Sequence, residues 1–185
     1  MKSILRAVAA LTLIAFVSAA DAVAAQGGAR PTSGACALEP TLSAALQERF
    51  GSSAVLTLGD LFEDERELFV EEHKGACPGM VKGSFFGDKQ RPATALLLMD
   101  IGPNKDILLV MARPALKTWT FLEVARSDKG TTAVISKESP GKYKDTVSGK
   151  EVRAGSDFAV LTAVGAWRRA YIWSGRAFEV VQLEE

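Results

Sequence analysis

A turn-rich stretch followed by an almost unbroken apolar run constrains the fold of this 185-residue chain more than any other feature. The stretch, Cys77 to Asp88, holds a Cys-Pro-Gly turn, a short extended run and a Gly-Asp loop, and the apolar run covers Thr94 to Ile101. A short apolar run bounded by turn residues is typical of a strand in a sheet core. The sequence therefore predicts a sheet organised around this segment.

Two parts of this stretch carry a family resemblance, and they read Cys77-Pro78-Gly79 and Gly83-Ser84-Phe85-Phe86-Gly87-Asp88. They are similar to the Cys-Pro-Gly turn and the Gly-Asp-Phe-Asn-Gly-Asp-Gly loop of the single FG-GAP or VCBS-like unit in many small secreted bacterial proteins. The resemblance runs from about Leu38 to the C-terminus and includes the ending Tyr171 to Phe178. It implies a fold more than a function, because the family is largely uncharacterised.

The loop departs from the family pattern where a cation would bind. Calcium takes about six to eight oxygen ligands. Ser84, Phe86, Lys89 and Pro92 stand where the family has acidic, amide or glycine residues, so Asp88 is the remaining strong oxygen donor of the loop. We therefore expect no calcium site in this loop, and the sequence indicates no cofactor.

The first 25 residues have the pattern of a Sec signal peptide. Lys2 and Arg6 give a charged start, and Ala7 to Val17 is an apolar core too short to span a bilayer as a helix. Val23-Ala24-Ala25 fits an A-x-A-like cleavage site, and Ala20-Asp21-Ala22 is a second candidate. We expect a periplasmic or secreted mature protein without a membrane span.

The signal-peptide pattern determines how we expect the chain to be divided. We expect a signal peptide over 1–25, a flexible N-terminal arm over 26–37 and a single domain over 38–185.

The whole chain has 22 basic and 22 acidic residues. A near-neutral chain creates no broad electrostatic field for nucleic acid or for an anionic membrane, so neither is an expected partner.

Cys36 and Cys77 are the two cysteines of the chain. In an oxidising compartment two cysteines are expected to form one disulfide, which would tie the N-terminal arm to the turn-rich stretch. The alternative, a pair of redox-active thiols, lacks the C-x-x-C spacing of such sites.

Two helices are expected at the start of the domain. Apolar residues recur at helical spacing in Pro40 to Phe50, and Gly51 follows as a stop signal. Asp60 would open the second helix, with Glu63 at capping-box spacing. The residues expected to form a buried stripe on this second helix are Leu61, Phe62, Leu68 and Phe69.

The second helix is strongly acidic. Seven acids and one base, Arg66, lie between Asp60 and Glu72. We interpret this charge as a solvated helix face, and an acidic docking surface for a basic partner is the functional alternative.

Strand patterns dominate the chain after Cys77. Consecutive strands joined by short turns indicate antiparallel pairing. The predicted class is α+β, with two N-terminal helices packed on a mainly antiparallel sheet of about six to eight strands. The expected strands beyond the turn-rich stretch cover 94–101, 106–113, 117–126, 131–136, 157–163, 168–174 and 177–183.

Lys137 to Asp157 interrupts this rhythm with glycines, a proline, serines and many charges. A loop of this length is uncommon unless it is functional or mobile. It is interpreted as a surface excursion or a binding loop, in which Lys150 to Arg153 would form a short strand. Its Lys142, Tyr143 and Lys144 place an aromatic ring between two cations and are the candidate partner-binding residues.

Catalytic signals are sparse. His73 is the only histidine, and its expected place at a helix end favours a structural role. A Ser-His-Asp triad would have to use it, yet no serine stands in a G-x-S-x-G elbow. One histidine and two cysteines expected to be oxidised do not make a zinc site.

The functional hypothesis is a non-catalytic, extracytoplasmic protein-binding module whose partner is another envelope or secreted protein. An inhibitor or immunity protein against a cell-wall hydrolase is its most concrete form. Two alternatives stay open: a cell-envelope hydrolase that uses a carboxylate pair, and a purely structural envelope protein.

Overall fold

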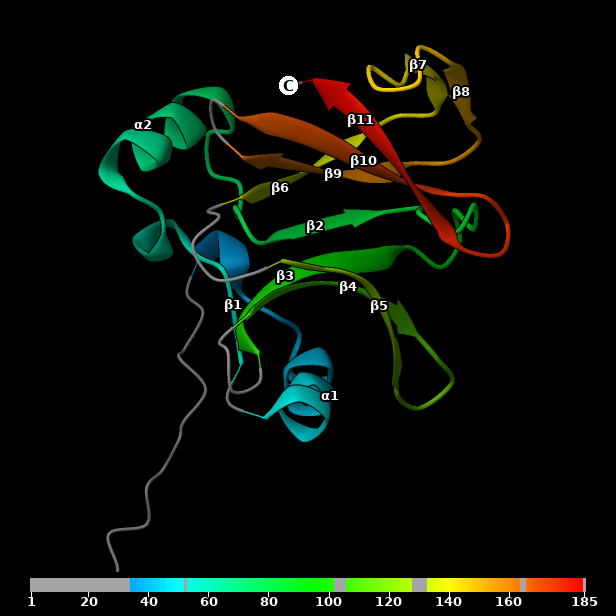
Figure 1. Cartoon of the computed structure of the whole chain (residues 1–185). Helices are drawn as coiled ribbons and strands as arrows, with labels where there is room; N and C mark the ends of the chain where they lie inside the picture. The colour runs from blue at the N-terminus through cyan, green and yellow to red at the C-terminus, as the bar shows by residue number, and fades with distance from the viewer. Residues whose placement is uncertain (1–33, 52, 102–105, 128–132, 164–165, 185) are drawn as a thin grey trace, which may run out of the picture.

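The computed structural model describes residues 34–51, 53–101, 106–127, 133–163 and 166–184 (Figure 1). The predicted signal peptide and most of the predicted N-terminal arm lie outside these residues. Within the described ranges, no helix has the length and apolar character that a membrane crossing requires.

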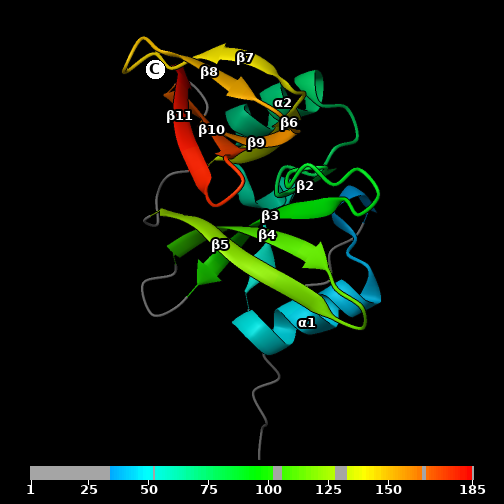
Figure 2. The same ribbon diagram turned by 90° about the vertical axis from the view of Figure 1, so that its right-hand side faces the viewer.

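The described strands form three antiparallel sheets, stacked between helix α1 (Pro40–Phe50) at one end and a small hairpin at the other (Figures 1 and 2). In sheet A the order is β1-β3-β4-β5, and β2 also pairs with β3. In sheet B the order is β11-β10-β9-β6, and β7 pairs with β8 in the third sheet. Sheet A comprises β1 (Ala54–Val55), β2 (Met80–Gly83), β3 (Ala93–Ile101), β4 (Asp106–Pro114) and β5 (Trp119–Ser127). The other strands are β6 (Val134–Glu138), β7 (Gly141–Lys144), β8 (Glu151–Ala154), β9 (Phe158–Ala163), β10 (Trp167–Trp173) and β11 (Phe178–Glu184).

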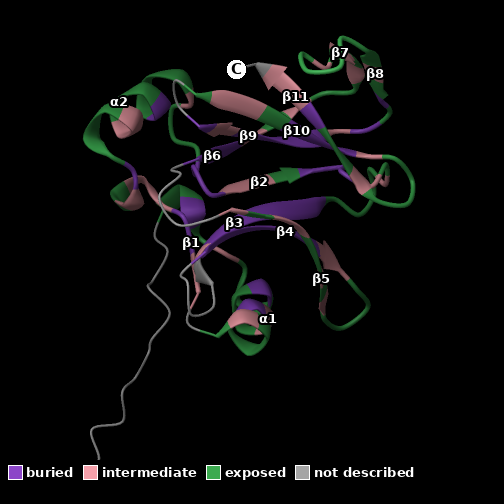
Figure 3. Ribbon diagram, viewed as in Figure 1, coloured by how far each residue is buried: buried purple, intermediate pink, exposed green. Residues whose placement is uncertain are grey.

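The buried strands β3 and β4 explain why the molecule has layers on both sides of sheet A (Figure 3). Successive side chains of a strand point to opposite faces. On β3, Leu96 and Leu98 pack toward α1, whereas Ala95 and Leu97 pack into the core shared with sheet B. A strand that is apolar on both faces needs cover on both faces, and α1 and sheet B provide it.

Helix α1 (Pro40–Phe50) covers the outer face of sheet A. It begins with a proline near its first turn, where a missing N–H costs nothing, and it ends at Gly51, whose φ of 67° suits glycine. Leu42 and Leu46 are buried in the interface. The bounds of α1 are those that the sequence predicts.

The turn-rich stretch lies between the two main sheets and joins them. The Gly79 carbonyl accepts a hydrogen bond from the Leu97 amide of β3 at 2.8 Å, and the Pro78 carbonyl accepts one from the Ile135 amide of β6 at 2.7 Å. Gly79 has to be glycine, because a Cβ there would lie 2.3 Å from the Leu56 carbonyl oxygen.

The downstream end of the same stretch is fastened by Asp157. Its Oδ2 atom accepts hydrogen bonds from the Ser84 amide at 2.8 Å and from the Ser84 hydroxyl at 2.9 Å. Ser156, the residue immediately before Asp157, donates its hydroxyl hydrogen to the Phe85 carbonyl at 3.2 Å. These polar contacts fix the end of β2 against the start of β9, so the stretch that organises the sequence also organises the fold.

Cys36 and Cys77 form a disulfide, as the sequence predicts. Both residues are buried beside α1, and 41 positions separate them in the chain. The bond ties the short 3₁₀ turn Gly34–Cys36 to the start of the turn-rich stretch.

The predicted α+β class is wrong, because strands account for 47% of the structure and helices for only 20%. The described residues contain eleven strands in three sheets rather than one sheet of about six to eight strands. The two helices also do not share a sheet face: α1 covers sheet A, and α2 (Glu63–Glu72) stands beside sheet B (Figure 1). The division into layers comes from the doubly apolar β3 and β4, which one layer of helices cannot cover.

Candidate functional site

Helix α2 starts later than the sequence predicts. Asp60 belongs to a preceding 3₁₀ turn (Leu58–Asp60), where its Oδ2 accepts hydrogen bonds from the Thr57 amide at 2.9 Å and the Thr57 hydroxyl at 2.6 Å. The first residue before α2 is Phe62, whose amide donates to Glu65 Oε2 at 3.2 Å. The chain therefore contains two consecutive caps, and the one at Asp60 closes the 3₁₀ turn.

The predicted buried stripe of this helix is only half correct. Leu61 and Phe69 are buried, but the side chains of Phe62 and Leu68 are 67% and 46% exposed. Phe69 is the one buried residue of α2. The seven-residue spacing fails because Leu61 and Phe62 precede the helix, so they do not continue its faces.

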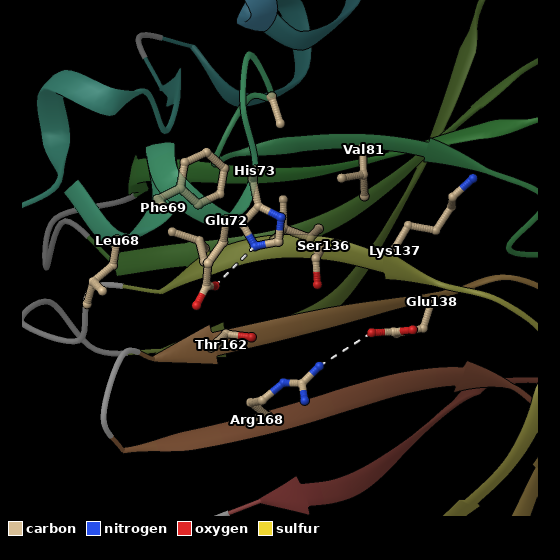
Figure 4. A pocket seen from close by; sticks show the side chains of 13 residues that line it. Leu68, Phe69, Glu72, His73, Val81, Ser136, Lys137, Glu138, Thr162 and Arg168 are labelled. Atoms are coloured by element: carbon tan, nitrogen blue, oxygen red, sulfur yellow. Dashed lines mark hydrogen bonds and ion pairs between the residues drawn. The ribbon is translucent and has the colours of Figure 1, made fainter. Parts of the chain in front are cut away.

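A groove with a cavity volume of about 590 Å³ lies between α2 and sheet B (Figure 4). Side chains from the C-terminal half of α2 form one wall, and side chains from β6, β9 and β10 form the other (Figure 4). The apolar lining residues are Leu68, Phe69, Ala76, Val81, Val134 and Ile135. The polar lining residues are Glu72, His73, Ser136, Lys137, Glu138, Thr162 and Arg168.

The strand register places the sheet wall of the groove on the outer face of sheet B. Val134 pairs with Thr162, and Thr162 pairs with Arg168, so these three side chains share a face. Farther along that face the hairpin β7–β8 covers Phe158 and Val160. The groove is thus the end of the outer face that the hairpin leaves open, with α2 beside it.

Ionisable side chains at the rim of the groove are joined in pairs (Figure 4). Arg168 Nη2 lies 3.4 Å from Glu138 Oε1, across the intervening strand β9. His73 Nε2 lies 3.7 Å from Glu72 Oε2. Lys137 Nζ reaches away to Asp157 Oδ2 at 4.0 Å. The groove therefore presents apolar walls beneath a rim of paired ionisable side chains.

His73 caps the C-terminus of α2, which confirms its predicted place at a helix end. Its amide donates to the Phe69 carbonyl at 2.8 Å, and its ring lies on the Phe69 ring with centroids 4.9 Å apart. The side chain lines the groove as well as finishing the helix. Among the described residues, no three His, Cys, Asp or Glu side chains gather in a way that could hold a metal ion.

The candidate residues Lys142, Tyr143 and Lys144 lie on β7, where successive side chains alternate in direction. The Tyr143 ring packs edge-on against Phe158 with centroids 4.7 Å apart, and its hydroxyl donates to the Ser139 carbonyl at 2.7 Å. Burial, with a smaller contribution from the charge of Glu138, raises the pKa of Tyr143. The two lysines are exposed, so the structure does not bring the three side chains onto one surface.

Much of the segment from Lys137 to Asp157, which the sequence predicts as a loop, forms the hairpin β7–β8. Residues of both strands, Tyr143 and Val152 among them, pack on the outer face of sheet B. The turn between the strands is held by Asp145, whose Oδ2 accepts the Ser148 hydroxyl. This hydrogen bond is the main reason that the pKa of Asp145 is lowered.

The Gly-Asp loop surrounds its one strong oxygen donor with hydrogen-bond donors. Asp88 Oδ1 accepts the amides of Gln90 at 3.0 Å and Arg91 at 3.2 Å. Asp88 Oδ2 lies 3.3 Å from Arg91 Nε and 3.9 Å from Arg113 Nη2. Two arginines beside one carboxylate make this loop electrostatically unsuited to a divalent cation. The absence of calcium from it stays a prediction.

Comparisons with protein-family models, with curated proteins and with solved structures give no match. The resemblance to FG-GAP or VCBS-like units therefore stays a prediction, and a function can be inferred only from the geometry of the chain itself. The sequence does not identify the groove residues Ser136, Thr162 and Arg168. Only the register of β6, β9 and β10 shows that these side chains lie on the same face of sheet B, the face beside α2.

Proposed function

We propose that the chain is an extracytoplasmic, non-catalytic polypeptide-binding module whose binding surface is the groove between α2 and β6. The observation that carries this proposal is the lining of the groove, in which apolar side chains such as Leu68 and Val134 lie below a rim of paired ionisable side chains. Binding surfaces in proteins commonly combine an apolar centre with a polar, solvent-accessible rim.

The proposed location rests on two features of the chain. The first is the signal-peptide pattern of residues 1–25. The second is the Cys36–Cys77 disulfide, which is compatible with an oxidising compartment. The periplasm and the extracellular medium both meet this condition.

Inhibition of a cell-wall hydrolase, or immunity to one, is the most concrete form of the proposal. A small exported domain that binds a polypeptide surface is suited to block another exported protein. The partner would insert a side chain into the groove, and the ordered sheets behind the groove would keep the surface preorganised.

The role of the groove in binding can be tested with a substitution that fills it. We suggest Ser136→Trp, because Ser136 lines the cavity from β6. As a matched control, Thr120→Trp adds the same side chain at an exposed position of β5. With the mature domain as bait in periplasmic extract, we expect one stoichiometric partner that Thr120→Trp retains and Ser136→Trp loses. Recovery of the same partner by both folded variants would contradict the proposed surface.

A second candidate function has one observation in its favour, because Glu72 and Glu138 both line the groove. A pair of carboxylates across a cleft is the arrangement that glycoside hydrolysis uses. Here each is paired with a base, Glu72 with His73 and Glu138 with Arg168. Turnover of peptidoglycan by the pure domain, abolished by Glu138→Gln, would favour the hydrolase over the binding module.

A further inference from the structure

A second, smaller cavity lies between sheets A and B, which stack one above the other in Figures 1 and 2. Its volume is about 70 Å³, and buried leucines of both sheets line it, Leu97 and Leu109 from sheet A and Leu161 from sheet B. One water molecule needs about 10–15 Å³ of such space, so the cavity has room for about five heavy atoms. A short aliphatic chain suits this size and this lining.

The apolar core is uncovered at the two sheet edges beside this cavity. Leu122 of β5 pairs with the buried Met111, so it lies on the face of sheet A that looks toward sheet B. Val180 of β11 pairs with Tyr171 and lies on the facing side of sheet B. These two apolar side chains are nevertheless 42% and 58% exposed. A ligand can therefore approach the space between the sheets from the edges formed by β5 and β11.

Arg169 of β10 lines the cavity as a cation without an anionic partner. Its Nε donates to Gln182 Oε1 at 3.0 Å, and its guanidinium carbon lies 4.4 Å from the centroid of the Trp167 ring. Within the described ranges Arg169 makes no ion pair. The ring and the amide hold the planar guanidinium in one orientation, and its two terminal nitrogens keep their hydrogens for a ligand.

The other arginine that lines the cavity, Arg126, is neutralised within the protein. Its Nη1 lies 3.1 Å from Asp106 Oδ2, and its Nη2 lies 3.7 Å from Glu123 Oε2. No acidic side chain of the described residues lines the cavity. The charge that a ligand would meet there is therefore the positive charge of Arg169, which favours an anionic group.

The Tyr171 side chain gives an independent indication of a ligand. Tyr171 is only 4% exposed and lines the cavity, but its hydroxyl makes no hydrogen bond to any described residue. Ser53 Oγ is the one fully buried side-chain oxygen or nitrogen without a partner in the described ranges. The Tyr171 hydroxyl is therefore not sealed in the core. Burial raises the pKa of Tyr171 against a smaller opposing effect of the Arg169 charge, so the hydroxyl keeps its proton and can donate a hydrogen bond.

We propose that this cavity binds an aliphatic carboxylate, whose chain fills the space between the sheets while its carboxylate accepts hydrogen bonds from the Arg169 guanidinium and the Tyr171 hydroxyl. The site is separate from the groove beside α2 and goes beyond the function proposed for that groove. Among the described residues, none lines both the groove and the cavity.

The probe is 4-methylpentanoate, a branched aliphatic chain with one carboxylate, titrated into the purified protein and followed by the NMR shifts of the amides. A ligand this small is expected to bind with a dissociation constant on the order of 1 mM. Acetate lacks the chain and 4-methylpentanamide lacks the charge, so each should bind at least about tenfold more weakly. Equal binding of the amide would overturn the proposed carboxylate site.

The same chemistry occurs at the C-terminus of a polypeptide that ends in leucine. A short peptide of glycine and serine with a free C-terminal leucine distinguishes this source from a free acid. Tighter binding of the peptide than of 4-methylpentanoate would support the site and identify a chain terminus as its ligand, and weaker binding would support the site with a small acid as its ligand. If neither probe binds, the proposal is overturned.

Two arginine variants locate the site. Arg169→Gln removes the charge at the cavity, and Arg176→Gln removes one charge at an exposed position between β10 and β11 as the matched control. We expect the first to weaken binding of 4-methylpentanoate at least about tenfold and the second to leave it within about twofold. An equal loss in both folded variants would show general attraction to the protein surface and overturn the assigned site.

Tyr171→Phe separates binding from folding, because it removes only the hydroxyl. In the free protein this hydroxyl has no hydrogen bond to a described residue, so the free energy of unfolding should not fall. Binding of 4-methylpentanoate should nevertheless weaken at least about threefold. Unchanged affinity in this variant would overturn the assignment of the hydroxyl to the site.

The groove variant Ser136→Trp serves as a control for location. Because it fills the groove on the outer face of sheet B, it should leave binding of 4-methylpentanoate unchanged. Loss of binding in this folded variant would place the acid in the groove and overturn the cavity as its site.

Discussion

Helices α1 and α2 are nearly equal in length, with 11 and 10 residues, but the protein holds them in different ways. Helix α1 buries Leu42 and Leu46 against sheet A. Its Phe50 packs edge-on against Phe121 at a centroid distance of 5.5 Å, and its Thr41 hydroxyl accepts a hydrogen bond from the Trp119 indole at 3.2 Å. The disulfide lies in the same apolar cluster.

Helix α2 is anchored by Phe69 and exposes most of its remaining surface (Figure 3). An isolated helix of this length is only marginally stable in water, so its order depends on packing. The difference suggests a division of roles, in which the α1 side of the molecule provides stability and the α2 side provides a surface for recognition.

The largest expected loss of stability is on the α1 side of the molecule, on removal of the disulfide. Cys36→Ser/Cys77→Ser should lower the free energy of unfolding by about 4 kcal/mol, because the bond closes a long loop in the unfolded chain. Urea denaturation measures this loss. In the wild-type protein, thiol labelling under denaturing, non-reducing conditions should find no free cysteine, and two labelled cysteines would contradict the bond.

The next prediction compares the loss of stability when one leucine from each helix is replaced by alanine. Leu46→Ala should cost about 3 kcal/mol, since it leaves a cavity in the interface of α1 with sheet A. Leu68→Ala should cost less than about 1 kcal/mol, because the side chain is 46% exposed. Chemical denaturation of the two single variants measures the loss of unfolding free energy in each. Equal losses would contradict the division of roles.

The hairpin β7–β8 gives a third, smaller effect. Tyr143→Ala should cost about 2 kcal/mol, because the half-buried ring packs on Phe158. Lys142→Ala/Lys144→Ala should change the free energy of unfolding by less than about 0.5 kcal/mol, since both lysines are exposed. The melting temperatures of the two variants distinguish these roles. A tyrosine variant as stable as the wild type would restore Tyr143 as a candidate for partner binding.

The smallest effect concerns acid stability at Asp157. Burial raises the pKa of this carboxyl, but the hydrogen bonds from Ser84 and the charges of Lys137 and Lys89 outweigh burial and lower it overall. A carboxyl whose folded pKa lies below its unfolded value of about 3.9 adds stability above that value. This stability is lost as the pH falls through the folded pKa. Denaturation curves should therefore show a steeper loss below about pH 4 for the wild type than for Asp157→Asn, and parallel curves would contradict the assignment.

The sequence predicts the local elements better than their assembly. The bounds of α1, the hairpin of β3 with β4, and the disulfide can be derived from periodicity, turn residues and cysteine count. The number of sheets cannot, because a doubly apolar strand such as β3 shows that both faces are covered without showing by what.

The groove is harder to predict than the fold. Its two walls come from α2 and from strands β6, β9 and β10, and pairing register decides which side chains meet. Adjacent charged and aromatic residues in the sequence predict a surface cluster at Lys142, Tyr143 and Lys144. Strand alternation sends the middle residue inward and the other two outward.

Native-state hydrogen exchange tests the difference between the two helices most directly. In the free domain we expect the amides of α2 to exchange at least about tenfold faster than those of α1, because one buried side chain holds α2. Equal protection of both helices in the free domain would contradict the account.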